Sequence, residues 1–248
     1  MPLFFFYPRI FHILKESFRK KGGIAVIKEV KGDLLKADTY YIAHQVNCRG
    51  KMGAGVAYQI RRYLLGERGY NDYRAICRNK PPKQLLGANQ YYPIKNGQVV
   101  VNMFGEDIPT GKGIDTDYDA LRKCLLNLRI AMEEEHKDAS IPGYLGCGLA
   151  GGSWDFVYTT MILPIFQKIS QTLYIVYRED SILKLWREFQ DVPYSNTGRL
   201  KESWHGFELF TDTFFIWKWF EDTFHVSVTE DLLKEKYDDM PLRLSEQS

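Results

Sequence analysis

One stretch of the chain, Tyr40–Ile60, joins an apolar run, a glycine-rich turn and a small-residue helix start. The run Tyr40–Val46 is rich in β-branched and aromatic residues, which is typical of a buried strand. Gly50, Gly53 and Gly55 then leave the backbone nearly free of Cβ atoms, so its N–H groups can turn toward a phosphate at the helix start. The spacing matches neither G-x-G-x-x-G nor the P-loop, so a tight turn without a ligand is the alternative.

The remaining patterns predict alternating strands and helices. Expected strands cover residues 24–30, 87–94, 98–104 and 173–179, with a short strand starting at residue 139; expected helices cover residues 54–64, 67–79, 118–135 and 154–169. Thr116, with Asp119 three residues on, is a candidate cap for the third helix, and Pro164 is expected either to kink the fourth or to belong to a shorter element. This alternation predicts an α/β fold, a three-layer α/β/α sandwich whose ligands gather outside the carboxyl ends of the strands.

A second glycine-rich turn mirrors the first. It follows the short strand at residue 139, and its glycines before Trp154 are Gly146, Gly148, Gly151 and Gly152. Both turns are expected to emerge at the same rim of the sheet. Cys48 and Cys147 lie in the two turns, either as ligand-lining or nucleophilic thiols or as small buried side chains that fit beside glycine.

The formal net charge of +2 hides an asymmetry within the 248-residue chain. Residues 1–180 carry 25 Lys/Arg against 18 Asp/Glu, whereas residues 181–248 carry 8 against 13. The basic part suits a pyrophosphate-like ligand, but it is far from the dense basic stripe of a duplex-binding protein. The four cysteines form no C-x-x-C pair, so no metal, cofactor or disulfide framework is expected, and the expected location is a reducing cytoplasm.

Composition divides the chain into three expected parts. Residues 1–23 form an N-terminal extension whose apolar run is too short to span a bilayer, residues 24–180 the α/β domain, and residues 181–248 a small, aromatic-rich, mainly helical extension. Its aromatic residues are either a lid or partner surface or the core of a helical unit, and the sequence indicates no particular partner for them. A short helix is also expected at Val226–Lys236.

Four motifs, GDLL, AHQVNCRGKMGAGVA, VNMFG and IPGYLGCGLAGGSW, occur in this order and resemble the macrodomain family, the ADP-ribose-binding, Appr-1-p processing-like proteins. The resemblance covers roughly residues 24–180. It implies that Asp33 accepts a hydrogen bond from the adenine amino group and that Asn47 lies beside the distal ribose. Without the other motifs, Asp33 reads as a simple turn residue.

The resemblance also implies that two loops line the ligand. Gly50–Val56 looks like the loop around the distal ribose and diphosphate, and Gly146–Gly152 looks like the second diphosphate loop. The implied ligand-binding residues are Asp33, Leu34, Asn47, Gly50, Met52, Gly53, Ala54, Gly55, Val56, Gly146, Cys147, Gly148, Leu149, Ala150, Gly151 and Gly152.

The GCGLAGG form is similar to a branch that contains ADP-ribose-1″-phosphate phosphatases and hydrolases that remove ADP-ribose from glutamate. His44 sits where some phosphatase-like members carry a histidine, so His44 and Asn47 are the implied catalytic residues; a hydrogen-bonded structural histidine is the alternative. The glutamate hydrolases rely on a lysine where this chain has Phe104 or Gly105, and on an acid where it has Ala150. This departure disfavours a lysine-adduct mechanism.

The resemblance therefore implies binding of ADP-ribose and hydrolysis of a terminal derivative, either ADP-ribose-1″-phosphate or an ADP-ribosyl group on a protein or nucleic acid. Ser153 and Asp155, close to the second turn, are further candidates for the chemistry. Two alternatives stay open: a non-catalytic reader of ADP-ribosylation, and an interaction protein that uses its aromatic extension.

Overall fold

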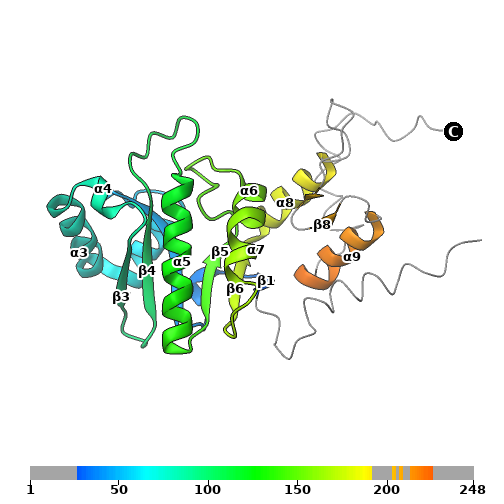
Figure 1. The fold of residues 1–248 in the computed structure, drawn as a ribbon, viewed down its shortest axis with the longest axis horizontal. Helices are drawn as coiled ribbons and strands as arrows, with labels where there is room; N and C mark the ends of the chain where they lie inside the picture. The colour runs from blue at the N-terminus through cyan, green and yellow to red at the C-terminus, as the bar shows by residue number, and fades with distance from the viewer. Residues whose placement is uncertain (1–26, 192–202, 205–206, 209–212, 226–248) are drawn as a thin grey trace, which may run out of the picture. The chain divides into compact units, whose positions relative to one another are not determined.

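The computed structural model describes residues 27–191, 203–204, 207–208 and 213–225 (Figure 1). The chain divides into two compact units: the first contains Asp33–Val176 together with the residues up to Lys28, and the second contains Glu29–Gly32 and the chain from Tyr177 onward. The domain boundaries expected at residues 24 and 180 stay a prediction. The N-terminal extension and the helix expected at Val226–Lys236 lie outside the described residues.

The described residues form a six-stranded mixed sheet with strand order β1-β6-β5-β2-β4-β3. The strands are β1 (Ile27–Lys31), β2 (Tyr41–Asn47), β3 (Asn89–Pro93), β4 (Val99–Glu106), β5 (Ala139–Pro142) and β6 (Leu173–Tyr177). β2 runs parallel to β4 and β5, β5 runs parallel to β6, and β3 is antiparallel to β4. The loops that follow β2, β4 and β5 therefore leave the sheet at the same edge.

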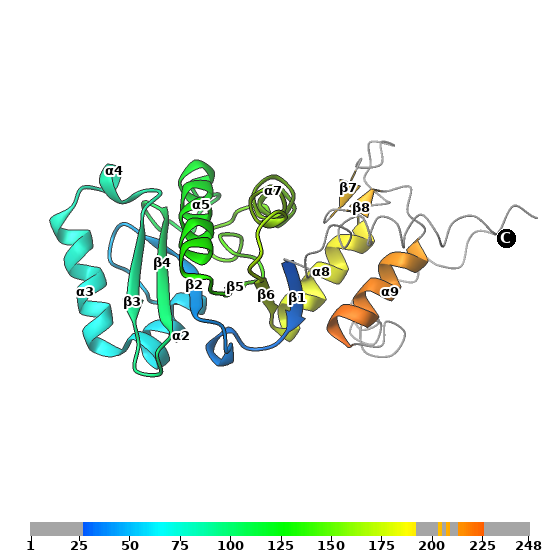
Figure 2. The same cartoon turned by 60° about the horizontal axis from the view of Figure 1, so that its bottom comes forward.

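Helices cover both faces of this sheet, which confirms the expected α/β sandwich (Figure 2). The elements are η1 (Leu34–Lys36), α2 (Gly55–Ile60), η2 (Arg61–Leu65), α3 (Gly66–Asn79), α4 (Pro82–Leu85), α5 (Tyr118–Glu135), α6 (Trp154–Val157), η3 (Tyr158–Ile162) and α7 (Leu163–Phe166). On one face, Tyr73 of α3 stacks on Phe104 of β4 with ring centroids 5.9 Å apart. α5 and α7 lie together on the other face (Figure 2).

The helix predicted at residues 118–135 is α5, with the predicted bounds. Its apolar stripe, Leu121, Leu125, Leu128 and Met132, is fully buried. The cap was predicted wrongly: Asp117, not Thr116, accepts a hydrogen bond from the N–H of Ala120. Thr116 lies one residue too early for this role, and its hydroxyl serves a loop contact described below.

Pro164 disturbs its helix as expected. A proline cannot donate a hydrogen bond to the carbonyl four residues earlier, here that of Thr160. The π-helical turn η3 lies directly before α7, and Arg122 Nη1 of α5 donates to Thr160 O instead, at 2.8 Å. A side chain from a neighbouring helix thus satisfies the carbonyl that proline leaves unpaired.

The second unit contains α8 (Glu179–Asp191), the two-residue strands β7 (Ser203–Trp204) and β8 (Phe207–Glu208), and α9 (Thr213–Phe224). Trp186, Phe220 and Phe224 are almost completely buried, and the rings of Trp186 and Phe220 meet edge to face at 5.0 Å. For these residues, the interpretation as the core of a helical unit is confirmed. No helix within the described ranges is long and apolar enough to cross a membrane.

Candidate functional site

Two glycine-rich loops meet at the carboxyl edge of the sheet, as their positions after β2 and β5 predicted. The first glycine loop comprises residues 48–54 and the second residues 143–153. A Cβ atom built on Gly55, where α2 begins, would lie 3.7 Å from Leu149 Cδ1 of the second loop. Leu149 is 69% exposed, so it stands at the surface between the loops.

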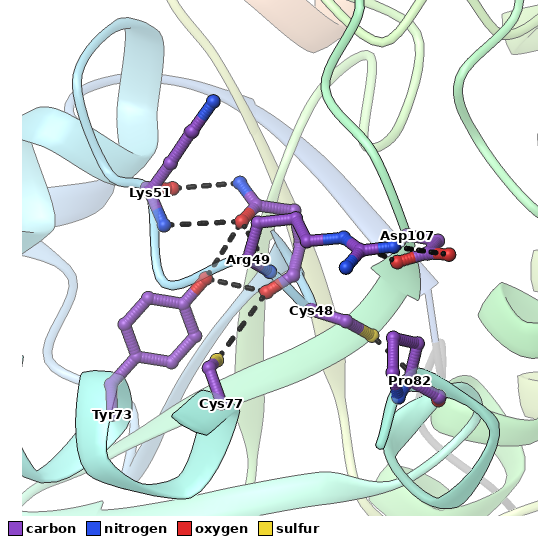
Figure 3. Close-up of polar contacts among 8 residues, drawn as sticks. Cys48, Arg49, Lys51, Tyr73, Cys77, Pro82 and Asp107 are labelled. Atoms are coloured by element: carbon purple, nitrogen blue, oxygen red, sulfur yellow. Dashed lines mark hydrogen bonds and ion pairs between the residues drawn. The ribbon is translucent and has the colours of Figure 1, made fainter. Parts of the chain in front are cut away.

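Asn47, the last residue of β2, organises the first glycine loop, whose Arg49 and Lys51 are shown beside Tyr73 in Figure 3. Its Oδ1 accepts hydrogen bonds from the N–H groups of Arg49 and Lys51, at 3.0 and 3.1 Å, and its Nδ2 donates to Lys51 O at 2.7 Å. Tyr73 of α3 donates its hydroxyl to Asn47 O at 2.5 Å. The side chain expected beside the ribose thus fixes the loop backbone, and any contact with a ribose stays a prediction.

His44 lies in the interior of the sheet, with no exposed surface. Its Nε2 lies 2.7 Å from Asn102 Oδ1 on β4, and Asn102 Nδ2 donates to Gln90 Oε1 on β3. Burial lowers the pKa of His44 from 6.5 to about 4, although the Asn102 contact opposes the shift. A neutral, enclosed imidazole cannot touch a ligand in this conformation, so the structure favours the structural alternative for His44.

The second glycine loop folds tightly on itself. Gly146 and Gly151 have φ values of +73° and +67°, in the left-handed region that glycine tolerates. Gly152 N–H donates to Gly146 O at 3.1 Å, and a Cβ atom on Gly152 would lie 2.6 Å from the same oxygen. The glycines at these positions are therefore required by the fold. Ser153, which was a candidate for the chemistry, caps α6: its hydroxyl oxygen accepts a hydrogen bond from Phe156 N–H.

A third loop, the β4–α5 loop of residues 107–117, covers the second glycine loop; sequence reasoning treated it only as a polar connection. Its Asp115 and Thr116 N–H groups both donate to Ala150 O, at 2.9 and 3.2 Å. Thr116 Oγ1 donates to Gly146 O at 2.5 Å and accepts from Gln45 Nε2 at 3.0 Å. The signal that was missed is that this loop follows a strand parallel to β2, which directs it to the same rim.

Glu106, at the end of β4, is a buried carboxyl group at this rim. Burial and, to a smaller extent, the charge of Asp115 raise its pKa to about 7, although a hydrogen bond with Gln45 opposes the shift. Asp107, which follows Glu106 in the chain, forms an ion pair with Arg49 of the first glycine loop, at 2.9 Å. The end of β4 thus ties the β4–α5 loop to the first glycine loop.

The predicted adenine-binding residue Asp33 is exposed and follows β1. Its Oδ1 accepts from Leu35 N–H at 3.0 Å, which caps η1, while Leu34 is buried. Gly32 N–H donates to Tyr177 O, so β1 ends beside the end of β6, at the rim where the loops lie. The structure therefore brings Asp33 to the predicted edge, and its adenine contact stays a prediction.

The remaining predicted ligand residues divide by exposure. Met52 and Cys147 are buried, whereas Gly53, Ala54, Gly55, Gly148 and Gly151 are exposed. Gly53 and Gly148 have no atom within 4 Å of an added Cβ, so they border open space. Burial raises the pKa of Cys48 to about 12, which argues against a nucleophilic thiolate there. Within the described residues, no group of three or more His, Cys, Asp or Glu side chains is placed to hold a metal ion.

Hydrogen-bond donors remain available in both glycine loops. Ala54 supplies no side-chain cap to α2, so the N–H groups at the start of this helix lack a capping partner. Among the described residues, the N–H groups of Gly148, Leu149 and Ala150 find no acceptor. The start of α2 and the second glycine loop thus lie close together and present backbone donors beside open space, which is an arrangement suited to an anion.

No protein-family model matches the chain. A stretch of 64 residues is 41% identical to ADP-ribose 1″-phosphate phosphatase of Saccharomyces cerevisiae; it makes up 25% of this chain and spans 34% of the yeast protein.

Solved structures match a larger part of the chain. The macrodomain of Mycobacterium tuberculosis DarG has a TM-score of 0.52 at 24% identity and covers 63% of this chain and 98% of its own. Thermosipho africanus DarTG, solved in complex with ADP-ribose, has a TM-score of 0.52 at 18% identity and covers 63% of this chain and 43% of its own. At these identities the likeness establishes a shared fold.

Proposed function

The first unit has the macrodomain fold, and on this premise we propose that it binds ADP-ribose or a close derivative where the two glycine loops meet. The observation that carries the proposal is the approach of the start of α2 to the second glycine loop, with N–H groups that Ala54 does not cap on one side and unpaired N–H groups on the other. Such donors satisfy pyrophosphate oxygens without a bulky side chain in the way. The exposed carboxylate of Asp33, at the same rim, is the proposed acceptor for the adenine amino group.

Calorimetric titration with ADP-ribose tests this proposal. We expect one binding site per chain. ADP, which keeps the adenine and pyrophosphate but lacks the distal ribose, is expected to bind more weakly. Ile130→Ala, on the exposed surface of α5, serves as a control that should bind like the wild type. The absence of binding by the folded protein at millimolar ADP-ribose would overturn the proposal and favour the interaction-protein alternative.

A second proposal is hydrolysis of a terminal ADP-ribose derivative, and the partial match to the yeast phosphatase favours it. Water would add across the bond at C1″ or its attached phosphate, releasing ADP-ribose and either inorganic phosphate or the freed acceptor group. Candidate substrates are ADP-ribose-1″-phosphate and ADP-ribosylated protein or nucleic acid. Binding without turnover of any of them would leave the reader function.

We propose that Asn47 and His44 serve this chemistry by positioning. Asn47 holds the backbone of the first glycine loop through hydrogen bonds. His44 joins the paired strands β2 and β4 through its contact with Asn102. Asn47→Ala and His44→Gln should therefore raise the KM of a hydrolysed substrate more than they lower kcat. A complete loss of kcat with unchanged substrate affinity and an intact fold would instead show a direct catalytic role.

A further inference from the structure

Among residues 33–176, positive charge is concentrated in one continuous segment. Residues 49–84, which run from the first glycine loop through α3 to α4, contain nine Lys/Arg and two Asp/Glu. Residues 85–176 contain seven Lys/Arg and ten Asp/Glu. Among residues 33–176, the basic balance therefore belongs to the α2–α3 side, whereas the remaining residues of this range are weakly acidic.

Arginine and tyrosine side chains are interleaved on this segment, and we term Tyr58, Arg61, Arg62, Tyr63 and Arg74 the Arg/Tyr surface. Arg61 and Arg74 pack on the ring of Tyr70, which is itself buried. The Arg61 guanidinium lies 3.8 Å from the centroid of the Tyr70 ring, and that of Arg74 lies 5.6 Å from the same centroid. Arg62 Nη1 donates to Tyr58 OH at 3.1 Å, and its guanidinium lies 5.7 Å from the Tyr63 centroid.

The backbone explains how residues of two elements share this surface. α2 passes into the π-helical turn η2, and α3 then begins at Gly66, whose φ of +62° lies in the left-handed region. The chain bends there, so Arg61 of η2 packs on Tyr70 of α3. Tyr70 also donates its hydroxyl to Gly50 O at 3.1 Å, which ties the surface to the first glycine loop.

Little of this positive charge is neutralised locally. Within the described residues, Arg61 pairs with Glu67 at 3.4 Å and Arg49 with Asp107, whereas Arg62 and Arg74 have no carboxylate within ion-pair distance. Tyr63 is 64% exposed and Tyr58 is 39% exposed, so both rings present area to solvent. Two exposed aromatic rings therefore lie beside the guanidinium group of Arg62, which no carboxylate of the described residues pairs.

We infer that the Arg/Tyr surface binds single-stranded nucleic acid. Guanidinium groups attract the phosphates of the strand, and exposed tyrosine rings supply faces on which unpaired bases stack. An acidic peptide would use the charges but not the rings, and duplex DNA hides its base faces from stacking. The inference goes beyond the proposed ADP-ribose site and does not depend on it, since no residue of the Arg/Tyr surface belongs to a glycine loop, although the surface adjoins the first one.

Fluorescence anisotropy with a labelled oligothymidylate of about 20 nucleotides tests this inference on the full chain. Tyr63→Ala should weaken binding about 5- to 150-fold, the range for one lost base stack, whereas Tyr63→Phe keeps the ring and should bind like the wild type. Arg62→Ala should reduce the slope of log affinity against log salt by about 0.7, as expected for one lost phosphate contact. Lys168→Ala, an exposed cation outside the segment, is the matched control and should leave both quantities unchanged.

Several outcomes would overturn the inference. They are no binding of the strand by the wild type at low salt, equal binding of a polyglutamate peptide, and binding that Tyr63→Ala leaves intact. ADP-ribose titration of Tyr63→Ala separates the two sites: we expect unchanged ADP-ribose affinity beside weakened strand binding. A joint loss of both, with an unchanged melting temperature, would mean that the surface is part of the ADP-ribose site and not a separate one.

Discussion

Gly148 offers the most direct test of whether the glycine loops serve a ligand. Its φ is outside the left-handed region, and a Cβ atom there would meet no atom within 4 Å. The fold therefore has no need of a glycine at this position. If Gly148 nonetheless matters, the reason is a bound group that must approach the backbone closely.

Gly148→Ala is expected to stabilise the folded protein and to weaken ADP-ribose binding. Alanine restricts the unfolded chain, so the free energy of unfolding should rise by about 0.4 to 1 kcal/mol, or about 1 to 4 °C in melting temperature. The methyl group would stand between the loop N–H groups and a phosphate. Loss of one charge-assisted hydrogen bond, about 1.5 to 3 kcal/mol, would weaken ADP-ribose binding about 10- to 150-fold.

Gly151→Ala in the same loop is the matched comparison. Its φ is +67°, and a Cβ atom would lie 2.1 Å from Gly113 O, a backbone atom of the β4–α5 loop. The left-handed conformation alone costs about 1 to 2 kcal/mol, so the melting temperature should fall by about 2 to 8 °C, and more if the clash is not relieved. Thermal unfolding measures the melting temperature of both variants, and calorimetric titration measures their affinity for ADP-ribose. Unchanged ADP-ribose affinity in Gly148→Ala would refute the proposal that this loop contacts the ligand.

Three further predictions concern groups at or beneath the rim. His44 has a folded-state pKa near 4 against 6.5 when unfolded, so acidification from about pH 6.5 to 4 should cost up to about 3 kcal/mol of stability, and His44→Gln should lack this loss. The pH dependence expected from Glu106 has the opposite sign. Its folded-state pKa is raised to about 7, so its contribution to the free energy of unfolding is present below the unfolded value of 4.5 and is lost as the pH rises through 7. Glu106→Gln should therefore be about 1 to 3 kcal/mol more stable than the wild type near pH 8, and an equal or lower denaturation midpoint there would contradict the assignment. Asn47→Ala removes the acceptor for the Arg49 and Lys51 N–H groups; it should destabilise the protein by about 1 to 3 kcal/mol and weaken ADP-ribose binding, whereas Asn47→Asp keeps the acceptor and should retain more of both.

The sequence alone determined the sheet-and-helix order and the meeting of the two glycine loops. Both are local matters: Leu121 and Leu125 repeat at helical spacing, and glycine clusters directly follow two apolar runs. Once those runs pair as parallel strands, their carboxyl ends share one edge. The aromatic extension was also interpretable, and the burial of Phe220 and Phe224 agrees with the interpretation of its aromatic residues as a helical core.

Only the tertiary structure decided what the residues at the rim do. His44 became an interior residue because strand register sets it opposite Asn102, 58 residues along the chain, and no local pattern encodes that pairing. Asn47 turns its side chain to the loop because the Arg49 and Lys51 N–H groups converge on it. The β4–α5 loop covers the second glycine loop for a similarly non-local reason. Spacing along the chain fixes which elements form, whereas contacts between distant segments fix which side chains are free to act.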